Sequence, residues 1–146
     1  MLKLKRIQLF GKLDSSAYKA LESATVLCKT RGNPYVELVH LINQILMADQ
    51  CDLHEILRYF NIDEARVSKD MVKALDMLPR GASSISDFAP SIEKAVKDGW
   101  MAASLVYKSS LIRTGYLLLA IKQDPELNRL LNDISPEFLK INGDLL

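Results

Sequence analysis

The chain has 146 residues, of which 49% are hydrophobic, and this length supports a single domain with one hydrophobic core. The 19 lysines and arginines nearly balance 18 aspartates and glutamates, which argues against the basic surface of a nucleic-acid-binding protein. Charged residues interrupt every apolar run before it reaches the roughly 18 residues of a membrane span. The start of the chain also lacks the features of a secretory signal. We therefore expect neither nucleic acid nor membrane as a partner, and a cytoplasmic location.

Apolar residues three and four positions apart predict helices through the first half of the chain, and no segment is typical of a sheet. Helices are expected at about 16–30, 37–48, 53–60 and 64–78. The first would begin at Asp14 or Ser15 as its N-cap. Its inward-facing residues are expected to be Ala17, Leu21, Ala24 and Cys28.

A linker rich in small and polar residues follows at 79–90, and helices are expected again afterwards. They are predicted at about 91–107, 115–123 and 126–132, with a last one opening at Pro136. Thr114 is a good N-cap for the helix at 115–123, whereas Leu38 occupies the equivalent place in the first half. Glu37 is then expected to supply negative charge at the earlier helix start. The final residues, 141–146, are short for a helix.

The two halves read as a tandem repeat. Leu13 matches Phe88 at a separation of 75 positions, and His40 matches Tyr116 at 76. We therefore predict one repeat at about 13–78, the linker at 79–90 and a second repeat at about 91–146. An imidazole and a phenol at the same place favour a shared structural role over a catalytic one for His40.

The sequence predicts no catalytic, metal or cofactor site. Cys28, Cys51, His40 and His54 are too few and too widely spaced for a zinc site, and the cysteines are interpreted as reduced, small buried hydrophobes. None of the six glycines falls in a phosphate-binding array. We therefore expect a binding module that is not itself an enzyme and carries no cofactor.

A family resemblance is carried by NPYVELVHLINQIL, LHEILRYFNID, LPRGAS and GYLLLAI, which together resemble the double Clp N-terminal domain of Hsp100 unfoldases. More narrowly, LFGKLDSSAYKALESATVLCK before NPYVE is similar to the version in the ClpV family, the ATPases of type VI secretion systems. The resemblance implies an all-α domain of two pseudo-symmetric four-helix repeats plus an N-terminal extension. It also implies a recognition domain whose hexameric ATPase modules are not in this chain, and which is a monomer in isolation.

The resemblance further implies a partner, which is an amphipathic N-terminal helix of the large contractile-sheath subunit. Its binding in a hydrophobic groove would mark contracted sheaths for disassembly and recycling. We expect the apolar extension, which includes Leu4 and Ile7, to form one wall with the first helix, and the start of the second repeat to form another. The candidate groove residues are Leu9, Phe10, Leu13, Ala17, Tyr18, Leu21, Phe88 and Ile92.

Several alternatives stay open. The same apolar residues could simply cover the helix bundle, and Trp100 is interpreted as core. The domain could instead bind apolar segments or an adaptor promiscuously, as in ClpB- or ClpC-type chaperones, or only pack on its own ATPase ring. A cysteine hydrolase would need an exposed thiol of low pKa. If the groove prediction holds, Leu13→Asp or Tyr18→Ala should weaken peptide binding with little loss of fold.

Overall fold

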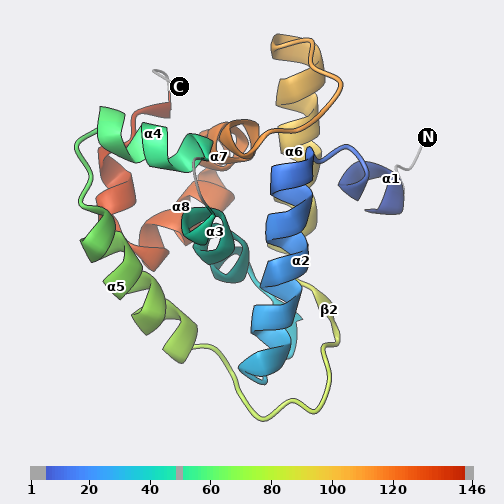
Figure 1. The fold of residues 1–146 in the computed structure, drawn as a ribbon, viewed down its shortest axis with the longest axis vertical. Helices are drawn as coiled ribbons and strands as arrows, with labels where there is room; N and C mark the ends of the chain where they lie inside the picture. Colours follow the sequence, from blue (N-terminus) through green and yellow to red (C-terminus); the bar gives the residue numbers. More distant parts are fainter. Residues whose placement is uncertain (1–5, 49–50, 144–146) are drawn as a thin grey trace.

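The computed structural model describes residues 6–48 and 51–143, and within them the chain is mostly helical (Figure 1). The all-α prediction is confirmed. The helices of the first half are α1 (Arg6–Phe10), α2 (Ser15–Thr30), α3 (Leu38–Met47), α4 (Asp52–Tyr59) and α5 (Glu64–Asp76). Those of the second half are α6 (Pro90–Met101), a π-helical turn η1 (Ala102–Val106), α7 (Thr114–Gln123), α8 (Pro125–Ile134) and a 3₁₀ turn η2 (Pro136–Lys140).

Side-chain caps fix several of the helix starts. The Asp14 carboxylate accepts a hydrogen bond from the Ala17 amide at 2.8 Å, so Asp14 is the N-cap of α2. The start of α7 is stabilised from outside its own repeat, because Asp52 of α4 accepts the Gly115 amide at 3.0 Å. Gly115 is required there, since a Cβ would lie 2.9 Å from the Asp52 Oδ2 atom.

One local prediction is wrong, and two predicted helices form but are not α-helical throughout. Thr114 is the first residue of α7, and Arg113 takes the N-cap position. The helix expected at 91–107 is α-helical only to Met101 and continues as the π-helical η1. The segment opening at Pro136 is a 3₁₀ turn, whose start is capped by the Ser135 hydroxyl.

The two halves interlock through short stretches of parallel pairing that the sequence did not predict. Strand β1 (Tyr35–Val36) pairs with β2 (Asp87–Phe88), and an isolated parallel bridge joins Leu13 to Ile112. These pairings are reciprocal, because Leu13 and Phe88 are 75 positions apart and Val36 and Ile112 are 76 apart. Leu13 and its counterpart Phe88 therefore each pair with an extended residue of the other half, and these two partners, Ile112 and Val36, also occupy equivalent positions.

The linker at 79–90 is held along the loop that joins α2 to α3. The Ala82 amide donates to the Gly32 carbonyl at 3.0 Å, and the Ser86 amide donates to the Pro34 carbonyl at 2.7 Å. Figure 1 shows this connection running from α5 past the C-terminal end of α2 to β2. The linker is therefore an ordered strap between the two halves.

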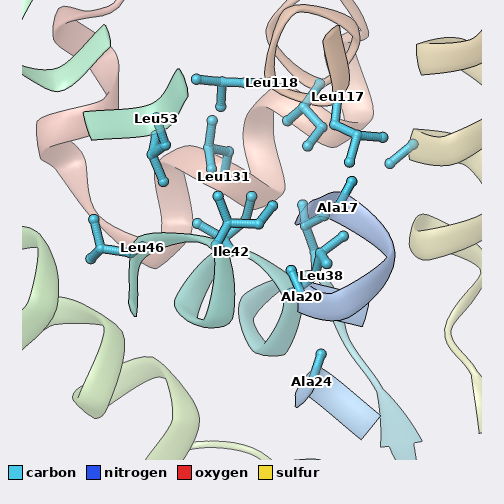
Figure 2. Close-up of a cluster of buried hydrophobic side chains, with 14 of the residues drawn as sticks. Ala17, Ala20, Ala24, Leu38, Ile42, Leu46, Leu53, Leu117, Leu118 and Leu131 are labelled. Carbon is cyan, nitrogen blue, oxygen red and sulfur yellow. The ribbon is translucent and has the colours of Figure 1, made fainter. Parts of the chain in front are cut away.

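The core is built around α3, which lies in the middle of the bundle. Figure 2 shows Ile42 of α3 among side chains from neighbouring helices, with Leu53 of α4 and Leu118 of α7 on the same side. Ala17, Ala20 and Ala24 form a narrow stripe on α2 that allows this helix to approach α3 closely. Trp100 is partly buried against this core, as predicted.

Candidate peptide-binding groove

A shallow groove of about 430 Å³ lies between α1, α2 and β2. Its lining is mainly apolar: Arg6, Ile7, Phe10, Gly11, Tyr18, Leu21, Glu22, Thr25 and Phe88. Ile7 is 80% exposed and Tyr18 is 46% exposed, so two large side chains remain in contact with solvent here. An open, apolar depression beside a helix is the kind of surface that receives the apolar face of another helix.

Arg6 holds the short helix α1 against the second half of the chain. Its guanidinium forms ion pairs with Asp87, at 2.6 Å, and with Glu93. The same group lies 5.6 Å from the centroid of the Phe88 ring, and Phe10 meets that ring edge-on at a centroid distance of 5.2 Å. These contacts keep one wall of the groove in place although α1 has only five residues.

The structure divides the eight candidate residues into two sets of equal size. Phe10, Tyr18, Leu21 and Phe88 come together in the lining of this groove. The others lie in the hydrophobic core and do not line it: Leu9, Leu13, Ala17 and Ile92. Leu4, which the extension also contained, lies outside the described residues.

Leu13 shows why sequence pattern alone could not separate wall from core. It is only 6% exposed and its backbone pairs with Ile112. The expectation that Leu13→Asp leaves the fold intact is therefore wrong, because the substitution would bury a carboxylate without a partner. Tyr18 remains a suitable position for a test, since it is half-exposed.

Some lining residues were missed from sequence. Glu22 and Thr25 follow Tyr18 at four and seven positions, so they share its face of α2, and this helical spacing could have identified them. Arg6 gave no such signal, because its role depends on carboxylates more than 80 positions away. Charge pairs across such distances are not visible in a local pattern.

His40 has a structural role, as predicted. Its ring is fully buried, its Nδ1 atom accepts the Glu37 amide at 2.8 Å, and its Nε2 atom donates to the Asn33 side-chain oxygen at 2.8 Å. Asn33 in turn donates to the Pro79 carbonyl at 2.8 Å. Burial, assisted by the charge of Arg31, lowers the His40 pKa to about 4. The neutral imidazole thus links the start of α3 to the linker.

Tyr116, the counterpart of His40, has a different environment. Its ring stacks on Tyr107 at a centroid distance of 4.7 Å and is only partly buried. The expected shared role is therefore limited to position, because the described part of the second half, up to residue 143, has no equivalent of the hydrogen bond from the buried ring to Asn33.

Both cysteines are free and buried, as predicted. The Cys28 Sγ atom lies 3.2 Å from the carbonyl oxygens of Asn33 and Tyr35, and burial raises the pKa of its thiol. The Cys51 Sγ atom contacts the Ile45 carbonyl at 3.2 Å. Since an inaccessible thiol of raised pKa is a poor nucleophile, the geometry argues against the cysteine-hydrolase alternative.

Among residues 6–48 and 51–143, no group of three or more histidine, cysteine, aspartate or glutamate side chains is arranged to hold a metal ion. No helix in this part of the chain is long and apolar enough to cross a membrane.

Residues 12–134 match the family model of the Clp repeat (R) N-terminal domain. The chain belongs to this Clp N-terminal domain family. The match includes both halves, and therefore both of the helical repeats that interlock at β1 and β2. The α1 helix, which carries Arg6 and Phe10, lies outside the matched range.

Two curated relatives are similar to the Clp N-terminal domain described above. The AAA+ ATPase ClpV1 of Pseudomonas aeruginosa is 51% identical over 146 residues, which are 100% of this chain and 16% of the relative. The chaperone protein ClpB of Yersinia enterocolitica is 48% identical over 136 residues, which are 93% of this chain and 15% of the relative. The chain thus spans only about a sixth of the length of these relatives.

Solved structures share the same Clp N-terminal fold. One, described as "Coevolution of the ATPase ClpV, the TssB-TssC Sheath and the Accessory HsiE Protein Distinguishes Two Type VI Secretion Classes", is 51% identical with a TM-score of 0.96 and covers 100% of this chain and 90% of that one. Another, "Complex of ClpV N-domain with VipB peptide", is 22% identical with a TM-score of 0.73, covers 96% and 89%, and supports the fold alone.

Proposed function

We propose that this chain is the substrate-recognition domain of a ClpV-like unfoldase in the cytoplasm. Its groove between α1, α2 and β2 binds an amphipathic N-terminal helix of the large contractile-sheath subunit. Capture of this helix delivers contracted type VI secretion sheaths to the ATPase modules of the parent protein, which disassemble them for recycling. The domain itself acts as a monomer and carries out no catalysis.

The observation that carries this proposal is the exposed apolar lining beside α1. Ile7 and Tyr18 leave apolar surface open to solvent, while Phe10 and Phe88 support the floor through their edge-on contact. A helix laid in such a groove would insert side chains at i, i+3, i+4 and i+7. The relative named ClpV1 and the 51% identical structure, whose description names the ATPase ClpV and the TssB-TssC sheath, support the choice of a sheath helix as the partner.

The rim charges favour a defined orientation of the ligand. Arg6 is already paired with Asp87 and Glu93, whereas Glu22, which lies on α2, is exposed in the lining of the groove. A bound helix is therefore expected to place a basic residue beside Glu22. Such a rim contact gives specificity and speed of association more than affinity.

A second candidate is a promiscuous receptor for apolar segments or an adaptor, as in ClpB-type chaperones. It is favoured by the relative named ClpB at 48% identity. The two functions differ in what the groove requires of its ligand, since a promiscuous receptor needs apolar residues but no particular helical register.

A titration separates these possibilities. A labelled peptide of the sheath subunit's N-terminal helix is titrated with the 146-residue chain by fluorescence anisotropy, next to a scrambled peptide of the same composition. Saturable binding of the native peptide alone supports sheath recognition. Equal binding of both peptides points to the promiscuous receptor, and binding of neither refutes both functions.

A further inference from the structure

A second groove lies on a different part of the molecule, between α4 and α7. Its volume is about 490 Å³, and it is lined by Asp52, Glu55, Ile56, Tyr59, Phe60, Tyr107, Arg113, Gly115, Tyr116 and Leu119. It shares no lining residue with the groove beside α1. Its chemistry therefore has to be explained separately.

Four aromatic rings dominate this second groove. Tyr107 and Tyr116 are stacked with an interplanar angle of 10° and a centroid distance of 4.7 Å. Tyr59 and Phe60 meet edge-on at 5.0 Å, and Tyr59 is 69% exposed. Ring faces carry partial negative charge and attract a cation placed over them.

The duplicated fold contains an internal comparison for this groove. The pair α3 and α8 is the counterpart of α7 and α4, and a groove of about 260 Å³ lies there as well. No aromatic residue lines that counterpart, and its apolar wall is aliphatic, from residues such as Leu38, Val39 and Leu78. Packing of the repeat therefore does not require aromatic residues at this place.

The charges around the aromatic groove leave one carboxylate available. Asp52 is occupied, because it accepts bonds from Arg113 at 2.7 Å and from the Gly115 amide at 3.0 Å. Glu55 is exposed on the next turn of α4, and its side chain forms no hydrogen bond or ion pair with any residue that the structure describes. Since Arg113 is held by Asp52, Glu55 keeps its negative charge beside the rings.

We propose that this aromatic groove binds an arginine side chain presented by a peptide segment of a partner protein. The flat guanidinium stacks on the tyrosine rings while its N–H groups donate to the Glu55 carboxylate. Stacking and a forked donor geometry suit arginine better than lysine, whose ammonium is a compact, strongly hydrated point charge. The aromatic groove would thus recognise one arginine of a partner protein, independently of the helix bound beside α1.

A matched pair of peptides tests this inference. Acetyl-Ala-Ala-Arg-Ala-Ala-amide and its citrulline analogue have nearly the same shape, but citrulline has no charge. Each is titrated into the ¹⁵N-labelled 146-residue chain and followed by NMR. The arginine peptide is expected to shift the amide signals of Gly115 and Tyr116, and the citrulline peptide to bind about two- to fivefold more weakly, the size of one exposed charged contact.

Variants on both grooves provide the control. Glu55→Gln and Tyr59→Leu are both at exposed positions and should each weaken binding of the arginine peptide about two- to fivefold, while Glu22→Gln beside α1 should have no effect. Equal affinity for arginine and citrulline, shifts located around Tyr18 instead of Gly115, or an unchanged affinity of both variants would overturn the proposal. None of these results bears on the sheath-peptide titration, so failure of one proposal leaves the other standing.

Discussion

His40 links the pH dependence of stability to a specific hydrogen-bond network. Burial and the nearby Arg31 lower its pKa from 6.5 to about 4, so the folded state keeps the ring neutral. In the unfolded chain the ring takes up a proton as pH falls through about 6.5. Between about pH 6.5 and pH 4 the unfolded state therefore binds more protons, and the folded state loses stability as pH falls. The contribution of neutral His40 is fully present above this range.

The size of the effect follows from the shift. One pKa unit corresponds to about 1.4 kcal/mol, so about 2–3 kcal/mol of unfolding free energy should be lost between about pH 7.5 and 4.5 through His40 alone. His40→Leu removes this titration but leaves the Glu37 amide and the Asn33 side-chain oxygen without their partner. Each such unpaired group costs about 1–3 kcal/mol, so the variant should be less stable at neutral pH.

Urea unfolding followed by far-UV circular dichroism, at several values between about pH 7.5 and 4.5, measures the difference between the two proteins. Other groups titrate in both proteins, so their effects largely cancel in this difference. The stability gap between wild type and His40→Leu should narrow by about 2–3 kcal/mol as pH falls. A gap that stays constant over this range would refute the assignment of His40 as a buried neutral residue.

Three further predictions concern other polar contacts. His54→Gln should destabilise the chain near pH 5.5 but hardly at pH 8. Burial opposes the charged form of His54, but hydrogen bonds, chiefly to Glu64, outweigh burial and raise the His54 pKa. Urea unfolding at several pH values checks that this pH dependence has the opposite sign to that of His40. Asp52→Ala should lower the unfolding free energy by about 1–2 kcal/mol, as thermal unfolding would show, because the Gly115 amide at the start of α7 loses its cap. Arg6→Gln should weaken sheath-peptide binding severalfold with little change in melting temperature, because exposed ion pairs add little to stability but here position α1.

Much of the fold could be predicted because the residue spacing of a helix can be recognised within one short segment of the sequence. The stripe of Ala17, Leu21, Ala24 and Cys28 fixes α2 and its buried face from spacing alone. The reciprocal pairings could not be predicted, because a strand of two residues has no periodicity and its partner lies in the other half.

Only four of the eight residues predicted for the groove line it, and the reason is again a contact between distant parts of the chain. Phe10 and Leu9 are neighbours on one short helix, and both are apolar, yet only Phe10 lines the groove. Both side chains are buried, and which of them lies against the groove depends on how α1 is held by the ion pairs of Arg6 with its distant carboxylates. Hydrophobicity in the sequence thus indicated which part of the chain forms the groove, but which of its residues line the groove depends on the three-dimensional structure.

The most direct measurement compares two exposed tyrosines that lie in different grooves. The affinity of the sheath subunit's N-terminal helix is measured for the wild-type chain, for Tyr18→Glu beside α1 and for Tyr59→Glu in the aromatic groove. We predict a loss of affinity of at least about tenfold for Tyr18→Glu, since a carboxylate would be buried against an apolar helix face, and no change for Tyr59→Glu. Normal affinity of Tyr18→Glu together with a loss for Tyr59→Glu would contradict the assignment of the groove between α1, α2 and β2 as the site of substrate recognition.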